Sequence, residues 1–180
     1  MRVFLAIPLT DDARHAIVHH LKGHLPHPLP GRPVRPELWH VTLRFLGEVD
    51  EVACDRVVRE VDDAARGPAF AVRWGDLGAF PRPKRANVLW LGVEQGEREA
   101  ERLAAAVEEG VEAAGFPPED RPFRCHLTLS RLRPDQDVTA VLEAVPPVGL
   151  AMPVDRVVLY RSHLGPGGPR YEEVEGFPLA

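Results

Sequence analysis

The chain carries His40-Val41-Thr42-Leu43-Arg44-Phe45-Leu46, and 86 residues further on it carries His126-Leu127-Thr128-Leu129-Ser130-Arg131-Leu132. Both stretches read His-x-Thr-Leu-x-x-Leu. The chain has four threonines, and two of them lie in these stretches. Random placement predicts roughly 0.02 occurrences of His-x-Thr-Leu, so two occurrences are not a chance match. The repeat indicates two similar structural units, each with one histidine and one threonine.

The first stretch is predicted to form a β-strand, in which alternate side chains share a face. This alternation places His40, Thr42 and Arg44 on one face. The opposite face, which includes Leu43 and Phe45, is apolar and is expected to pack on a core. Arg44 is therefore a candidate for countering the charge of an anion held by the other two polar residues.

The second stretch repeats this arrangement with one difference. His126, Thr128 and Ser130 are expected on the shared face. Arg131 is one position out of phase, and it needs a strand end or a β-bulge to turn toward the same side. Cys125 stands directly before the histidine, so its side chain is expected on the opposite face and not as a nucleophile.

Two imidazoles with ordinary pKa values of about 6.5 coexist near neutrality as one neutral and one protonated ring. This pair suits phosphodiester hydrolysis, in which one ring takes a proton from water and the other supplies a proton to the leaving oxygen. The two threonine hydroxyls can donate hydrogen bonds to phosphoryl oxygens. No carboxylate cluster accompanies the motifs, which favours chemistry without a metal ion, and we expect no cofactor.

Composition narrows the class of protein. The chain is 44% hydrophobic and 27% charged, as in ordinary globular proteins, and its net charge is −5. A protein that coats nucleic acid without sequence preference is usually basic, although a locally positive cleft could still hold one phosphate. No apolar run approaches the roughly 20 residues of a membrane span. The N-terminus does not resemble a secretory signal.

The two cysteines, Cys54 and Cys125, do not form a paired spacing. They argue against a disulfide framework and against a structural zinc site. We therefore expect a protein of the reducing cytoplasm, with no membrane association and with a monomer as the default oligomeric state.

Helix and strand signals alternate along the chain. Helices are expected from the N-cap Thr10 to Gly23, from the N-cap Asp50 to about Ala65, over 97–114 and over 137–144. Strands are expected over 2–8, 38–46, 69–74, 86–93, 123–131, 154–162 and 170–175, with loops over 25–36 and 78–85. This order predicts an α+β fold: one bilobal domain over 1–180, with two similar mixed or antiparallel sheets flanked by helices around a central cleft.

The chain resembles the two-histidine (2H) phosphoesterases, specifically the RNA 2′,3′-cyclic phosphodiesterase branch, also called 2′-5′ RNA ligase. The resemblance covers nearly the whole chain. The two His-x-Thr stretches carry it, together with the opening strand Arg2–Pro8, the stretch Val88–Val93 and the tail from Leu159 to Tyr171. It implies a bilobal α+β fold with the active site between the lobes.

The resemblance also implies an activity and roles for the motif residues. The reaction is hydrolysis of a 2′,3′-cyclic phosphate to a 2′-phosphomonoester, on tRNA fragments, oligonucleotides or cyclic nucleotides. By this analogy His40 is the general acid for the departing 3′ oxygen and His126 is the general base for water. Thr42 and Thr128 hold phosphate oxygens, and Arg131 lies near the phosphate or the terminal base.

Two other functions remain open. A 2′-5′ RNA ligase would use the same site in reverse, joining the cyclic end to a 5′-hydroxyl. Hydrolysis is favoured because water is abundant and no nucleotide-activating Gly-x-x-x-x-Gly-Lys loop is present. A non-catalytic RNA-end binding module would be expected to lack one histidine. The family often has proline before the second histidine, and here Cys125 stands there.

Several further residues have a functional and an ordinary interpretation. A metal site could be built from the His-rich segment, although a solvated helix face is favoured for His15, His19, His20, His24 and His27. His163 is interpreted as a loop or strand-end residue. Tyr171 and Trp39 could stack on a base.

A basic segment lies between the strands expected over 69–74 and 86–93. Arg82, Lys84 and Arg85 could contact RNA phosphates, and a plain solvated loop fits them equally well.

Overall fold

The computed structural model describes all residues from Met1 to Ala180. Its helices are α1 (Asp11–His24), α2 (Glu51–Ala64), α3 (Glu97–Ala113) and α4 (Thr139–Ala144), with a 3₁₀ turn η1 (Pro36–Leu38). Its strands are β1 (Arg2–Pro8), β2 (Arg32–Pro33), β3 (His40–Glu48), β4 (Phe70–Arg82), β5 (Arg85–Gln95), β6 (His126–Gln136), β7 (Ala151–Val154), β8 (Arg156–Gly165) and β9 (Gly168–Pro178).

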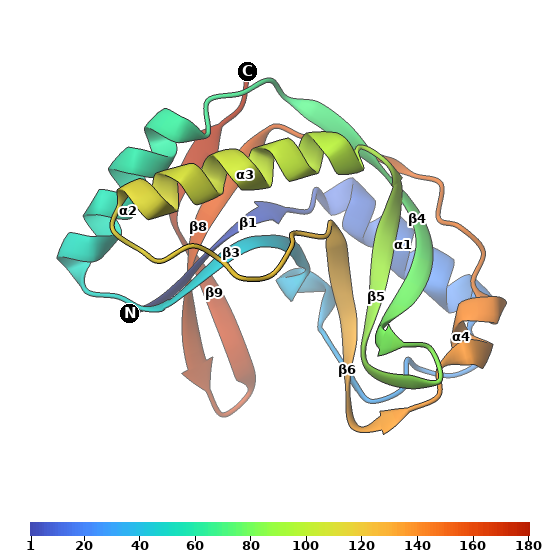
Figure 1. The fold of residues 1–180 in the computed structure, drawn as a ribbon. Coiled ribbons are helices and arrows are strands. Elements are labelled where there is room, and N and C mark those ends of the chain that lie inside the picture. Colours follow the sequence, from blue (N-terminus) through green and yellow to red (C-terminus); the bar gives the residue numbers. More distant parts are fainter.

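The strands form two sheets, and every strand pairing is antiparallel. The first sheet has the order β3-β1-β8-β9 and the second has the order β2-β6-β5-β4-β7. Figure 1 shows the sheets splayed apart beneath α3. The predicted α+β fold with two sheets is confirmed. The lobes are not the two halves of the chain, however, because the first sheet contains both the first and the last strands.

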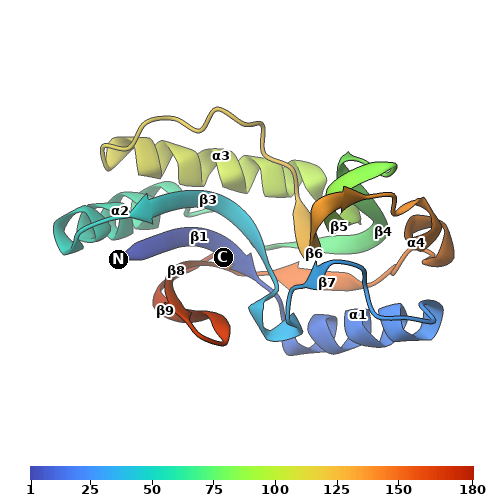
Figure 2. The same cartoon turned by 90° about the horizontal axis from the view of Figure 1, so that it is seen from below.

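The helices cross between the lobes. Helix α1 follows β1, yet it reaches the second lobe, where His20 Nε2 lies 2.7 Å from the carbonyl oxygen of Pro146. Helix α3 follows β5 of the second sheet, yet it packs on α2 and β3 of the first lobe. Figure 2 shows α1 and α3 on opposite sides of the strands. Because each lobe is covered by a helix that follows a strand of the other, the sequence alternation alone did not predict the layers.

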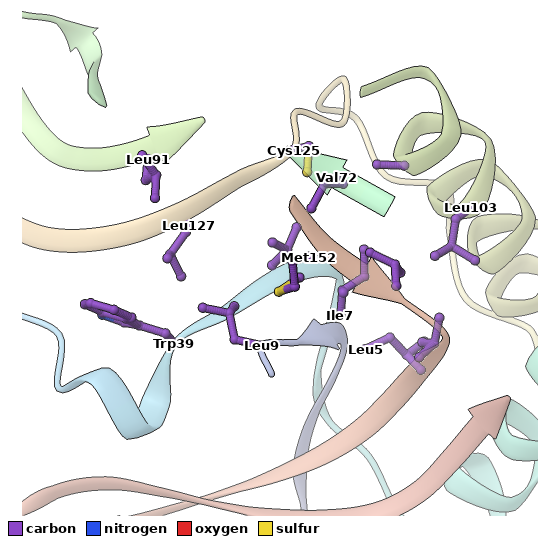
Figure 3. Packing of buried hydrophobic residues seen from close by; sticks show 14 of the residues in the cluster. Leu5, Ile7, Leu9, Trp39, Val72, Leu91, Leu103, Cys125, Leu127 and Met152 are labelled. Atoms are coloured by element: carbon purple, nitrogen blue, oxygen red, sulfur yellow. The ribbon is translucent and has the colours of Figure 1, made fainter. Parts of the chain in front are cut away.

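A single hydrophobic cluster of 38 buried residues joins the two sheets. Figure 3 shows Ile7 of the first sheet close to Met152 of the second. Burial of such side chains stabilises a protein by about 1.5–3 kcal/mol each. The shared core therefore holds the two sheets in one relative orientation.

The helix starts follow the predicted caps. The Ala13 N–H donates to the Thr10 hydroxyl at 3.1 Å, and the Ala53 N–H donates to the Asp50 carboxylate at 2.7 Å. Each such cap is worth about 1 kcal/mol. Helix α1 runs one residue past Gly23, which was expected to end it. None of the helices is both long enough and apolar enough to cross a membrane.

The expected loop over 78–85 is mostly strand, and only the turn at 83–84 separates β4 from β5. This strand contains Gly78, where a Cβ would come within 2.3 Å of the Trp90 ring, so the position requires a glycine. Pro81 is tolerated because β7 pairs only with residues 70–73 of β4, so the far end of β4 is an edge.

The strand expected over 154–162 is two strands. Asp155 interrupts it, and β7 joins the second sheet while β8 joins the first. The expected strand over 170–175 is longer, because β9 pairs with β8 as a hairpin from Gly168 to Pro178.

Candidate active site

The two motif strands belong to different sheets but contact each other, and His40 and His126 are the first residues of β3 and β6. Burial lowers the pKa of His40, and the nearby charge of His126 lowers it further. The Arg131 guanidinium contributes to lowering the pKa of both histidines. Positions 86 residues apart in the chain are thus brought into electrostatic range of each other.

Both imidazoles are held in the same way. His40 Nδ1 lies 2.8 Å from the Leu38 carbonyl oxygen, and His126 Nδ1 lies 2.8 Å from the Arg124 carbonyl oxygen, two residues back in each case. A carbonyl oxygen only accepts, so Nδ1 carries the proton in both rings. This leaves Nε2 as the reactive nitrogen, and in His40 it lies 2.9 Å from the Thr42 hydroxyl.

A β-bulge at Leu43 changes the phase of the first motif strand. Thr42 pairs with Ala6 and Arg44 pairs with the next residue of β1, Leu5, so Leu43 has no partner opposite. Beyond the bulge, Arg44 lies on the same face of the sheet as the core residue Leu5. Phe45, instead of Arg44, lies on the face that carries His40.

The expectation that Arg44 faces an anion with His40 is therefore wrong. The Arg44 side chain is 7% exposed and forms an ion pair with Glu108 of α3. Its Nη2 also donates to the Pro117 carbonyl at 2.6 Å. These contacts join β3, α3 and the loop after α3, which is a structural role.

The second motif strand has the equivalent bulge at Leu129. Thr128 pairs with Trp90, and Ser130 pairs with the next residue of β5, Leu89. Ser130 was expected beside His126, but it is fully buried and donates its hydroxyl to the Pro30 carbonyl. The same shift turns the exposed Arg131 toward the histidines. From the sequence, Arg131 was expected to face this side only at a strand end or a β-bulge, and a bulge is present.

An aromatic cluster lies beside His40. The Phe4 ring centroid is 4.9 Å from that of His40, 4.9 Å from that of Tyr171 and 5.7 Å from that of Phe45. Phe45 was expected in the core but is 57% exposed, because the bulge turns it outward.

Trp39 is 5% exposed and donates its indole N–H to a backbone carbonyl, so it presents no ring face for stacking on a base.

A second aromatic cluster lies beside His126. Phe80 contacts Trp90 at 5.0 Å and His126 at 5.3 Å between ring centroids. The Arg124 guanidinium lies over Trp90, 4.9 Å from the ring centroid. Gly78 and Gly92 leave room for this indole, since a Cβ at either would come within 3 Å of it. Arg124 was not predicted from the sequence, although it stands only two residues before His126.

Burial is the largest cause that lowers the pKa of each catalytic candidate. Repulsion from Arg131 and His126 adds to this effect at His40, and repulsion from Arg124 and Arg131 adds to it at His126. The backbone carbonyls at Nδ1 act in the opposite direction, and Glu97 also raises the pKa of His126. On balance both rings favour the neutral form in the free protein.

The other candidate side chains are buried or paired elsewhere, and none of them joins the two histidines. Cys125 is buried, and burial raises its pKa to about 12, which makes it a poor nucleophile. His163 pairs with Glu172 of β9 at 2.6 Å. Arg85 lies 3.5 Å from Asp135 at the far end of the β4–β5 hairpin.

The histidines of α1 do not gather into a metal-binding group. His20 and His24 contact each other, with ring centroids 4.5 Å apart. No group of three or more histidine, cysteine or acidic side chains in the chain is placed to hold a metal ion.

A family model described as the 2′-5′ RNA ligase superfamily matches residues 9–166. This chain belongs to the 2′-5′ RNA ligase superfamily. The resemblance read from the two His-x-Thr stretches is confirmed, and the superfamily match includes both stretches.

Relatives named RNA 2′,3′-cyclic phosphodiesterase align over nearly the whole chain of this superfamily member. The protein of Thermus thermophilus is 38% identical over 188 residues, covering 99% of this chain and 90% of the relative. The protein of Archaeoglobus fulgidus is 34% identical over 183 residues, covering 98% of this chain and 99% of the relative. The protein of Escherichia coli is 32% identical over 180 residues, covering 99% of this chain and 96% of the relative.

Solved structures of superfamily proteins have the same fold. Escherichia coli LigT in complex with 3′-AMP matches with a TM-score of 0.83 at 31% identity, covering 99% of this chain and 98% of LigT. TT0787 of Thermus thermophilus matches with a TM-score of 0.79 at 34% identity, covering 99% of this chain and 97% of TT0787.

Proposed function

We propose that this protein hydrolyses the 2′,3′-cyclic phosphate at an RNA end to a 2′-phosphomonoester, without a metal ion, with His40 as general acid and His126 as general base. The observation that carries the proposal is the matched pair of imidazoles. Each is fixed through Nδ1 by the carbonyl two residues before it, and each keeps Nε2 for the substrate. Such fixed rings favour proton transfer on both sides of one phosphorus atom.

The bonds change as follows. His126 Nε2 takes a proton from water as the water oxygen bonds to phosphorus. The bond from phosphorus to the 3′ oxygen breaks, and that oxygen takes the proton from His40 Nε2. The bond to the 2′ oxygen remains, so the product is a 2′-phosphomonoester. Solvent then resets both protons. Each assisted proton transfer contributes about 10²–10⁴-fold to the rate.

Three side chains serve the phosphoryl group in this proposal. Thr42 and Thr128 hold its oxygens through their hydroxyls, and Arg131 balances its charge. Arg131 already acts on both histidines in the free protein. A bound phosphodiester anion opposes the repulsion among these cations, so substrate binding favours protonation of His40.

The relatives support this activity. Those described above are named RNA 2′,3′-cyclic phosphodiesterase. Escherichia coli LigT has been crystallised with 3′-AMP and with phosphate, which are the kinds of group that the proposed site would hold.

The proposal is tested with adenosine 2′,3′-cyclic phosphate. The wild type should release adenosine 2′-phosphate, and EDTA should leave the rate unchanged. His40→Ala and His126→Ala should each lower kcat by about 10²–10⁴-fold. Both variants should unfold near the wild-type temperature, since each histidine stands at a strand start and is only half-buried. Near-normal turnover in either variant would overturn the two-histidine mechanism.

Ligation is the alternative function, and the cluster at His126 is the observation that favours it. A nucleoside stacked on Phe80 and Arg124 would present a 5′-hydroxyl to the general base in place of water. Adding a 5′-hydroxyl oligonucleotide separates the two reactions, because only ligation yields a longer strand with a 2′-5′ bond.

A further inference from the structure

A cavity of about 490 Å³ adjoins His40 on the side of the first lobe. It lies among the end of β1, the first turns of α1, η1 and the turn of the β8–β9 hairpin. Tyr160 and Tyr171 line it together with His40. Its volume is within the range of small-ligand sites, about 300–1,000 Å³. His126 does not line it, so the cavity is an extension of the acid side of the proposed site.

The lining of the cavity is positive although the protein as a whole is negative. Arg14, Arg35 and Arg170 line it, against one acidic residue, Glu37, in a chain with a net charge of −5. Local charge of this sign attracts anions regardless of the net charge.

Arg35 is the arginine best placed to bind an anion. Its Nη2 donates to the Pro169 carbonyl at 3.1 Å, and the nearest carboxylate, that of Glu37, is 3.9 Å from its Nε. A carbonyl is neutral, so this hydrogen bond orients the guanidinium without cancelling its charge. Arg14 is already committed, since it pairs with Asp11 and donates to the Pro36 carbonyl at 3.0 Å.

The two tyrosines add neutral donors. Burial raises the pKa of both Tyr160 and Tyr171, so their hydroxyls stay protonated. Neither hydroxyl makes a hydrogen bond within the protein that affects its pKa. Phenol hydroxyls and a guanidinium together form the kind of donor set that binds a phosphodiester.

The proposed reaction places a second phosphate near this cavity. The oxygen that His40 protonates belongs to the terminal ribose, so that ribose lies on the His40 side. Its 5′ carbon carries the phosphodiester that leads to the rest of the RNA. A cyclic mononucleoside lacks this group.

We propose that the cavity beside His40 binds the phosphodiester on the 5′ side of the terminal nucleotide, with Arg35 as its charged ligand, so that the protein is built for RNA ends rather than for cyclic mononucleotides. This inference rests on the proposed function. It adds a specificity site that the two His-x-Thr motifs do not contain.

The first test compares three substrates: adenosine 2′,3′-cyclic phosphate, the same nucleotide carrying a 5′-phosphate, and the dinucleotide ApA ending in a 2′,3′-cyclic phosphate. The two substrates with a 5′ phosphoryl group should have kcat/KM values about tenfold higher or more, which is the effect of one charge-assisted hydrogen bond. Equal values for all three would overturn the inference. Hydrolysis of the first substrate would then still support the proposed function, whereas no hydrolysis of any substrate would overturn both.

The second test changes Arg35. Arg35→Gln keeps a polar side chain but has no charge, and Arg35→Lys keeps the charge. The ratio of kcat/KM with the 5′-phosphate to that without it should fall toward one in Arg35→Gln and stay high in Arg35→Lys. Arg59→Gln, which removes an exposed charge from α2, is the matched control and should keep the wild-type ratio. A purely structural Arg35, or a cavity that binds the base, would lower the rates of all three substrates together and leave the ratio unchanged, which would overturn the inference.

Discussion

Phe45 and Arg131 occupy equivalent positions in the two motif strands, five residues after His40 and His126, and both lie on the histidine face. Each reaches that face because one leucine after the threonine has no partner in the neighbouring strand. The two lobes therefore contribute unlike groups from like positions. One contributes an exposed aromatic ring suited to stacking, and the other contributes a cation suited to phosphate.

The pH dependence of catalysis should follow the lowered pKa values of both histidines. Values of kcat/KM report the free protein, in which burial and nearby cations favour the neutral rings. The bell-shaped profile of kcat/KM should therefore centre below the ordinary histidine pKa of 6.5. The profile of kcat should lie at higher pH, because the bound anion favours protonation. A steady-state series from about pH 4.5 to about pH 9 measures both profiles. A kcat/KM profile centred above the ordinary value of 6.5 would contradict the assigned environment.

Arg124→Gln should shift the acid limb of the kcat/KM profile to higher pH. The Arg124 charge helps to lower the pKa of His126, and a general base must be neutral, so losing the charge means that a higher pH is needed to deprotonate it. Arg124→Lys should leave the limb near its wild-type position. Arg121→Gln removes an exposed charge from the same loop and is the control, since Arg121 is not among the groups that shift His126. An unmoved limb in Arg124→Gln would show that the guanidinium does not act on the base.

Arg44→Met should destabilise the protein while leaving the chemistry of the folded fraction within a few-fold of wild type. The change leaves Glu108, with a side chain 23% exposed, and the Pro117 carbonyl without their buried partner. We expect a loss of about 2–4 kcal/mol in the free energy of unfolding, measured by urea titration. Adding Glu108→Gln should restore part of it. A variant that folds normally but no longer hydrolyses substrate would instead place Arg44 at the phosphate.

The order of acid and base can be tested with a leaving group that needs no proton. A p-nitrophenyl phosphodiester releases a stable anion, so it depends on the general base but little on the general acid. His40→Ala should retain a much larger fraction of wild-type activity on this substrate than His126→Ala. The rate of p-nitrophenolate release is measured by absorbance for each variant. If His126→Ala retained the larger fraction of wild-type activity, His126 would be the acid and His40 the base.

Much of the site could be predicted because its chemistry is local in the chain. His40 and Thr42 are two residues apart, so any extended strand presents them on one face. The same holds for His126 and Thr128. The caps at the start of α1 and α2 were also predicted, because a cap joins residues three apart.

The parts that could not be predicted depend on a partner strand. Nothing within the first motif distinguishes a regular strand, which would place Arg44 on the histidine face, from a bulged one, which places Phe45 there. The hydrogen-bond register with β1 makes that choice. Likewise, residues 154–162 are predicted from the sequence as one strand, and only pairing with β4 or with β1 divides them between the two sheets.

The amino-acid order alone specified two imidazole–hydroxyl pairs, the positions of the helices and the class of reaction, because these follow from side-chain chemistry and from contacts a few residues apart. Which arginine lies near the histidines, which aromatic ring is exposed and which segments line the cavity beside His40 were decided by the assembled fold. The physical reason is that a strand's phase beyond a bulge, and a cavity built from four separate segments, are properties of pairing between distant residues and have no counterpart in any single stretch of the chain.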